Sequence, residues 1–184
     1  GYSGESLSWT ATDLHPDEYT IELQGSGIVK GPLTWSSENP IIFDIPDGLN
    51  VGDFYYTINF TDTFDNSLID TVQVTVLDTQ NPLIDAYPED LILESGYTRE
   101  SLSWTATDAN PDSYTIVLQG SGIVEGPIGW SSGNPITFDI PDGLSIGEYY
   151  YTINFTDAYN HFITDTMKLT VEDTGNPLIT DTPE

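Results

Sequence analysis

The stretch ESLSWTATD occurs twice in this chain without a change, at residues 5–13 and again at residues 100–108. Apolar and hydroxyl-bearing side chains alternate in it, so that Leu102, Trp104 and Ala106 fall on one face of an extended segment. Such alternation is typical of a β-strand with one buried face. The stretch therefore predicts the same core strand in two equivalent domains.

The repeat extends far beyond these nine residues. Residues 1–89 align without a gap with residues 96–184, and roughly two-thirds of the aligned positions are identical. A unit of this length exceeds the ~20–50 residues of a solenoid repeat and has the size of a small domain. We predict domain 1 at residues 1–79 and domain 2 at residues 80–174. Residues 175–184 are then a linker, the start of another repeat, or an inter-subunit tail.

Short extended segments separated by Gly, Pro, Asn and Asp turns make up the second copy. No stretch of the sequence shows sustained helical periodicity. We therefore predict an all-β chain of two tandem immunoglobulin-like β-sandwich domains, with about seven strands in each. The expected strands of the second copy lie at residues 91–95, 101–108, 113–120, 136–140, 148–157 and 162–173, together with a segment that ends at Trp130.

The first of these strands, residues 91–95, has no counterpart in the first copy, which is therefore expected to lack its own strand A. Residues 81–90, with Pro82 and Pro88, are predicted to be a linker that enters this strand. The C-terminal segment NPLITDTPE aligns with part of that linker, so we expect it to end before the next such strand.

The last third of each copy carries a pattern of spaced residues. In the first copy Gly52 precedes an alternating strand with Tyr56, Ile58 and Phe60, and the segment TVQVTVLDTQNP follows at residues 71–82. This pattern resembles the hyalin-repeat (HYR) group of immunoglobulin-like extracellular domains. The sequence lacks the paired cysteines that are usual in that group.

Other parts of the chain resemble other extracellular repeats. Trp9 followed by Tyr19, Ile21 and Leu23 is similar to a fibronectin type III domain, and the linker DTQNP resembles the calcium-binding linkers of cadherins. The pattern WTATD, NP, YTI resembles tandem immunoglobulin-like repeats of large archaeal surface proteins. These resemblances imply a structural or adhesive extracellular role, usually without catalysis.

Charge excludes several classes of partner. The chain has 30 Asp and Glu against 3 Lys and Arg, a formal net charge of −27. Nucleic acid and anionic membrane surfaces need a basic face, which this composition does not provide. No transmembrane run is present in the sequence, so membrane insertion is not expected here. Self-repulsion of this size favours bound divalent ions or a high-salt environment.

Calcium is the predicted ion, because oxygen-rich residues are expected to converge where the chain enters the second sandwich. Calcium takes about 6–8 oxygen ligands. The predicted ligands at this junction are Asp78, Asn81, Asp108, Asp112 and Asp157. The equivalent positions of domain 1 are Asp13, Asp17 and Asp62, whose linker partner would come from a preceding repeat or another chain. The alternative is that Asp and Asn occupy these turns for backbone reasons alone.

The glycosylation motif N-x-T occurs at Asn59 and Asn154, the same place in each copy. If Tyr56, Ile58 and Phe60 point inward, Asn59 points outward and is accessible. Glycosylation is therefore predicted at both positions. The alternative is a plain surface asparagine on a strand.

Catalysis finds little support in the residues. His15 aligns with Asn110, and His161 aligns with Asn66, so neither histidine is repeated. Cysteine, and with it a thiol nucleophile or a disulfide, is absent from the sequence. Trp35 and Trp130 lie near turns and are expected to be partly exposed, which would allow them to stack on sugars. We predict that the chain is not an enzyme.

Together these patterns predict a non-catalytic extracellular module, one unit of a surface stalk, fibre or filament. The expected partners are copies of itself or neighbouring repeats in head-to-tail contact. The alternative is a calcium-dependent adhesin or a carbohydrate-binding module that binds surface glycans.

Overall fold

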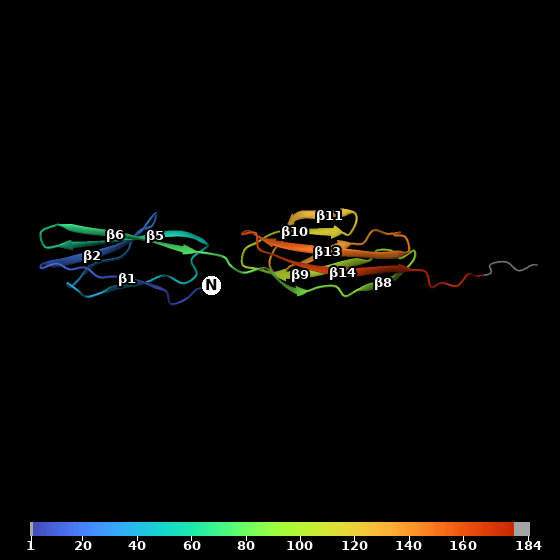
Figure 1. Cartoon of the computed structure of the whole chain (residues 1–184), viewed down its shortest axis with the longest axis horizontal. Coiled ribbons are helices and arrows are strands. Elements are labelled where there is room, and N and C mark those ends of the chain that lie inside the picture. Colours follow the sequence, from blue (N-terminus) through green and yellow to red (C-terminus); the bar gives the residue numbers. More distant parts are fainter. Residues whose placement is uncertain (1, 179–184) are drawn as a thin grey trace, which may run out of the picture. The chain divides into compact units, whose positions relative to one another are not determined.

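A computed structural model of the chain describes residues 2–178 and divides it into unit 1 (Gly1–Asp78) and unit 2 (Thr79–Glu184). Within the described residues every regular element is a strand (Figure 1). The all-β prediction is therefore confirmed. Across residues 2–178 there is no helix with the length and apolarity needed to span a membrane.

Unit 2 is a sandwich of two sheets built from eight described strands. The larger sheet has the order β11-β10-β13-β14-β8 and the smaller the order β12-β9-β7 (Figure 1). All neighbours are antiparallel except β8 and β14, which run parallel. The strands are β7 (Leu83–Ala86), β8 (Leu91–Glu94), β9 (Ser101–Thr107), β10 (Pro111–Leu118), β11 (Gly122–Gly129), β12 (Pro135–Asp139), β13 (Gly147–Asp157) and β14 (Phe162–Glu172).

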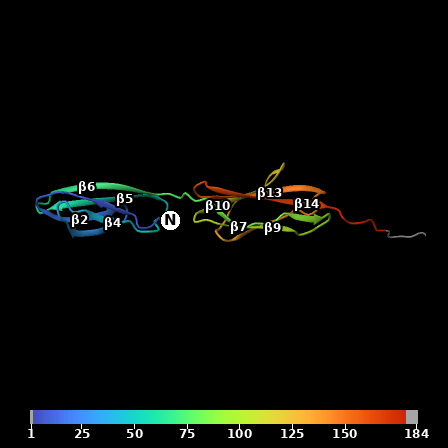
Figure 2. The same cartoon turned by 60° about the horizontal axis from the view of Figure 1, so that its bottom comes forward.

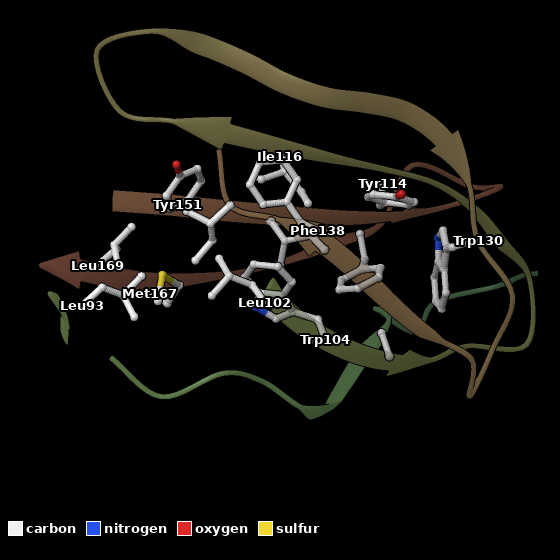
Figure 3. Close-up of a cluster of buried hydrophobic side chains, with 14 of the residues drawn as sticks. Leu93, Leu102, Trp104, Tyr114, Ile116, Trp130, Phe138, Tyr151, Met167 and Leu169 are labelled. Carbon is white, nitrogen blue, oxygen red and sulfur yellow. The ribbon is translucent and has the colours of Figure 1, made fainter. Parts of the chain in front are cut away.

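The core of unit 2 lies between these sheets. Leu102, Trp104 and Ala106 on β9 are buried, as their alternation predicts. In Figure 3 Leu102 and Trp104 point toward Tyr151 and Ile116 of the opposite sheet. The Trp104 indole also donates a hydrogen bond of 2.8 Å from Nε1 to Asp165 Oδ2 on β14, so it links the two sheets.

Unit 1 has the same arrangement of central strands, but the described residues form fewer strands in total. Its larger sheet has the order β3-β2-β5-β6, and among the described residues its smaller sheet pairs β1 with β4. Figure 2 shows β2, β4, β5 and β6 of this unit. Trp9 donates to Asp70 Oδ2 at 2.9 Å, the counterpart of the Trp104 bond. The strands are β1 (Ser6–Trp9), β2 (Pro16–Leu23), β3 (Gly27–Thr34), β4 (Ile41–Asp44), β5 (Gly52–Asp62) and β6 (Ser67–Val76).

The segment predicted to be a linker into unit 2 contains a strand, which corrects the sequence analysis. Leu83–Ala86 forms β7 and pairs with β9, with Leu83 opposite Thr107 and Ile84 opposite Ala106. The following strand β8 leaves this sheet and joins the other one beside β14. The prediction of a linker was wrong because nearby prolines exclude a helix but still permit a short edge strand.

Trp35 and Trp130, expected to be partly exposed, are buried, with 8% and 6% of their surface accessible. Their rings pack edge-on against Phe60 and Phe155, with centroid distances of 4.9 and 5.1 Å. Each indole donates from Nε1 to a backbone carbonyl at 2.9 Å, that of Thr61 in unit 1 and its counterpart in unit 2. The expectation was wrong because a nearby carbonyl satisfies the one polar atom, so the whole ring can be buried.

Candidate functional site: an open sheet edge in unit 1

Unit 1 contains, within its described residues, no counterpart of β7 or β8. Strand β1 ends at Trp9, whereas β9 continues for three more residues to Thr107. Those three residues, Thr105–Thr107, are the ones that pair with β7. Residues 10–12 of unit 1 have the same sequence, TAT, but form no strand. The shorter β1 therefore follows from the missing neighbour, because a strand needs a partner for its backbone groups.

A hollow opens between the two sheets at this edge. It has a volume of about 190 Å³, and Ala11, Thr12 and Leu68 are among the residues that line it. The aromatic rings of Trp35 and Phe60 also line it. The rest of the lining is polar and consists of Asp13, Thr61, Asp62, Asn66 and Ser67. The hollow therefore has a mixed polar and apolar surface.

The corresponding place in unit 2 is filled. Ile84 of β7 packs against the core there, and Ala106 is completely buried. Across the hollow, Leu68 of unit 1 is 60% exposed, whereas its counterpart Ile163 is partly buried against the core. We call the surface formed by Ala11, Thr12, Trp35, Phe60 and Leu68 the open edge.

A second uncovered stretch lies along β6. In unit 2 the counterpart strand β14 buries Met167, Leu169 and Val171 almost completely beside β8. Their equivalents in unit 1 are the smaller or branched residues Val72, Val74 and Val76, and all three remain half-buried. Among the described residues of unit 1, no strand takes the place that β7 or β8 has in unit 2.

Asp62, one of the predicted calcium ligands, organises the turn between β5 and β6. Its Oδ1 accepts hydrogen bonds from the amides of Phe64 and Asn66 at 2.8 and 2.9 Å. Its Oδ2 accepts one from the Asn66 side chain at 2.8 Å. These bonds, with the Asn66 side chain as the largest contribution, hold the pKa of Asp62 below its ordinary value.

Asp157 organises the corresponding turn of unit 2, between β13 and β14, and is only 1% exposed. Its Oδ1 accepts from the amides of Tyr159 and His161 at 2.8 Å, and its Oδ2 lies 2.8 Å from His161 Nδ1. The side chains of His161 and Asn66 therefore fill the same role at aligned positions. This explains why the histidine is not repeated.

The aspartates before β2 and β10 also have structural partners. Asp13 and Asp108 each accept from the amide two residues later at 2.7 Å and donate from their own amide to a serine hydroxyl. Asp17 and Asp112 are exposed near the start of those strands. In the linker Asp78 is half-buried and Asn81 exposed. Calcium at the junction of the repeats stays a prediction.

The glycosylation motif lies on the outer face of the larger sheet in each unit. Asn59 on β5 stands between Thr20 and Ile69 of the neighbouring strands, and Asn154 between Thr115 and Thr164. Both side chains are half-buried, and their Oδ1 atoms are buried. Glycosylation of the two asparagines stays a prediction.

Chains similar to this one are found among solved structures. No protein-family model matches the sequence, and no curated protein matches it. The titin domains z1z2, solved in complex with telethonin, match with a TM-score of 0.58 and 16% identity, covering 94% of this chain and 91% of that one. Fibronectin(III)-like modules of Clostridium thermocellum CbhA match with a TM-score of 0.40 and 13% identity, covering 97% and 93%.

The titin match confirms the predicted fold class. The chain is a tandem pair of immunoglobulin-like β-sandwiches. The more specific resemblances, to hyalin repeats and to archaeal surface proteins, stay predictions.

Proposed function

We propose that this chain is a non-catalytic extracellular structural module, one unit of a surface stalk, fibre or filament. Its partners are copies of itself or neighbouring repeats, joined head to tail. The observation that carries this proposal is the tandem repetition of one immunoglobulin-like sandwich, with the same central strand order in both units. Repetition of one folded unit along a chain is typical of proteins that span a distance.

The charge of the chain supports end-to-end contacts over lateral ones. A net charge of −27 makes broad side-by-side packing of copies unfavourable. Strand addition depends instead on backbone hydrogen bonds and on a small apolar contact, which need no opposite charge. Repetition through strand addition therefore suits an acidic chain.

The other proposed roles find less support in the side chains. A sugar-binding face needs an accessible aromatic ring, and both Trp35 and Trp130 are buried. Of the repeated carboxylates, Asp62 and Asp157 are engaged in turn hydrogen bonds. A mechanical role fits this arrangement better than catalysis or glycan binding.

Imaging of the native assembly by electron cryomicroscopy tests the proposal. We expect filaments in which sandwiches of this fold follow one another end to end, with additional density on Asn59 and Asn154 if both are glycosylated. Native material consisting only of isolated single chains that bind glycans saturably would contradict it.

A second proposal is that calcium offsets the charge of the acidic loops. The net charge and the exposed Asp112 support it. We expect a chelator at low salt to lower the melting temperature, and calcium to restore it at a concentration where sodium does not. An identical melt with and without chelator would contradict calcium binding.

A further inference from the structure

The two predicted glycosylation motifs lie in the middle of central strands. Residues 57–62 and residues 152–157 have the same sequence, TINFTD, and each stretch contains one motif, at Asn59 and at Asn154. Strand β5 pairs with β2 on one side and β6 on the other, and β13 pairs in the same way with β10 and β14 (Figure 1). The fold therefore places both acceptor asparagines inside a fully paired sheet rather than in a loop.

Neighbouring strands enclose the side chain of each asparagine. Asn154 stands directly between Thr115 on β10 and Thr164 on β14. In an antiparallel sheet the Cβ atoms of such opposite residues lie ~4.5–5.5 Å apart. Asn154 is accordingly half-buried, and its Oδ1 atom is buried without a hydrogen-bond partner. Asn59 has the same burial in unit 1, so the enclosure follows from the fold that the two units share.

The threonine of the motif is also engaged in unit 1. Thr61 Oγ1 donates a hydrogen bond of 3.0 Å to the backbone carbonyl of Glu18 on β2. An enzyme that recognises N-x-T has to contact this hydroxyl together with the asparagine amide. In the folded sheet the hydroxyl is already bonded to the neighbouring strand, so its recognition would require the two strands to separate.

The chemistry of N-glycosylation requires close access to the amide nitrogen. This nitrogen is a poor nucleophile, because its lone pair is delocalised into the carbonyl group. The enzyme therefore has to surround the amide, hold it against C1 of a sugar on a lipid-linked phosphate donor and accept one proton from Nδ2. The Nδ2–C1 bond forms, the bond from C1 to the phosphate oxygen breaks, and the lipid phosphate leaves with that electron pair. Strands at a spacing of ~4.8 Å on both sides leave no room for an enzyme around the amide.

Transient opening of the folded sheet gives little additional access. A central strand loses both neighbours only when its sandwich unfolds, so exposing it costs nearly the global free energy of unfolding. The unfolded fraction of a native domain is ~10⁻³–10⁻⁶. Access to Asn154 within β13 is therefore expected to be at least about a thousandfold rarer than access to an asparagine in a turn.

We infer that Asn59 and Asn154 receive their glycans before the sandwiches fold and are closed to the transferase afterwards. The folded sheet accommodates the finished product, because burial of Oδ1 leaves Nδ2 as the outward atom of each amide. Occupancy of the two sites is then set by competition between transfer and folding. This inference goes beyond the filament role and rests only on the predicted glycosylation.

Glycosylation in vitro tests this order of events. A purified oligosaccharyltransferase with a lipid-linked oligosaccharide is given the folded full chain or the synthetic peptide TINFTD with blocked termini, and mass spectrometry measures the occupancy of each asparagine. Because the peptide has the sequence of both sites, a difference in rate reports the effect of the fold. We expect Asn59 and Asn154 of the folded chain to be modified at least about a thousandfold more slowly than the peptide.

A motif placed in a turn is the matched control. Phe162→Thr creates N-H-T at Asn160, which is exposed in the turn between β13 and β14. Phe162 is 59% exposed and its counterpart in unit 1 is Ser67, so the change is expected to leave the fold intact. We expect the folded variant to be modified at Asn160 and to stay unmodified at Asn154. Failure at Asn160 would show that position in the sheet is not the cause, and would overturn the inference.

Destabilising one unit provides the converse test. Trp104→Ala removes the fully buried ring of unit 2 and raises the unfolded fraction of that unit. We expect this variant to gain modification at Asn154, while Asn59 in the unaltered unit 1 stays unmodified. Equal occupancy at the two asparagines would contradict the inference.

The remaining outcomes separate this inference from the proposed function. Modification of Asn59 or Asn154 in the folded native chain at a rate comparable to that of the peptide would overturn the inference. A peptide that is never modified would overturn both the inference and the predicted glycosylation, and would leave the filament role standing. Native chains that carry both glycans but form no filaments would support the acceptor sites and contradict the filament role.

Discussion

Unit 1 and unit 2 contain the same core stretch, yet they bury it to different degrees. Trp104 is fully buried, whereas Trp9 retains 8% of its surface, and Ala106 and Ala11 differ in the same way. The difference arises from β7 and β8, which close unit 2 and have no counterpart among the described residues of unit 1. The two units therefore show how much β7 and β8 add to the burial of the same core stretch.

The two copies also differ most in sequence beside the uncovered region. All residues from 63 to 69 differ from their counterparts, and Val72 and Val74 replace Met167 and Leu169. Residues 63–66 form the turn between β5 and β6, and residues 67–69 begin β6. Val74 is the counterpart of Leu169, which pairs with β8 in unit 2. Smaller apolar side chains are expected at Val72 and Val74, since less apolar surface is left exposed when no strand covers them.

The largest predicted effect comes from removing the central tryptophan of each unit. Trp104→Ala is expected to destabilise unit 2 by about 3–5 kcal/mol, because a fully buried ring leaves a cavity and Asp165 loses its donor. Trp9→Ala is expected to cost less, since its surroundings are more open. Denaturant unfolding monitored by residue-specific nuclear magnetic resonance signals of each unit measures both. An equal or larger cost for Trp9→Ala would contradict the comparison.

An intermediate effect is expected from weakening the strand that closes unit 2. Ile84→Ala removes half-buried apolar contacts between β7 and the core and is expected to cost about 2 kcal/mol. It should also make the amide of Thr107 exchange faster. The matched control is Ile92→Ala on β8, which is 64% exposed and is expected to change stability by no more than about 0.5 kcal/mol. If the two changes cost the same, β7 does not close the core.

The smallest predicted effect concerns the hydrogen-bonded pair of Tyr114 and Glu125 in unit 2. Burial, followed by a hydrogen bond of 2.6 Å to Glu125, raises the pKa of Tyr114 from 10.0 to about 12. Unit 1 has Lys30 in place of Glu125. The folded-state pKa lies above the unfolded one, so the stabilisation is complete below pH 10 and is lost between pH 10 and about 12.

Two substitutions test the hydrogen bond between Tyr114 and Glu125. Glu125→Lys is expected to lower the pKa of Tyr114, which an ultraviolet titration of the folded chain detects. Tyr114→Phe is expected to remove the phenol that titrates near pH 12 and to flatten the loss of stability above pH 10. An unchanged titration in Glu125→Lys would show that the carboxylate does not contribute.

The sequence was sufficient to predict the strands with a clear alternation. Tyr56, Ile58 and Phe60 are buried as expected, because period-two patterning shows directly which face of a strand is covered. Repetition at a constant offset predicted two domains of one fold. These features are local, so they can be read from adjacent residues.

Features that depend on distant partners were not predicted. Strand β7 is four residues long and shows little alternation, so only its pairing with β9 identifies it. The parallel pairing of β8 with β14 joins residues about eighty positions apart. Burial of Trp35 depends on a carbonyl from another strand, that of Thr61.

Amide exchange at Thr12 and Thr107 in the dilute full chain tests the central claim most directly. Ala106 directs its carbonyl to the Gly133 amide, so its neighbour Thr107 faces β7, and Thr12 faces the open edge in the same way. We predict rapid exchange at Thr12 and slow exchange at Thr107. Equal, slow exchange at both positions in dilute solution would contradict an open edge in unit 1.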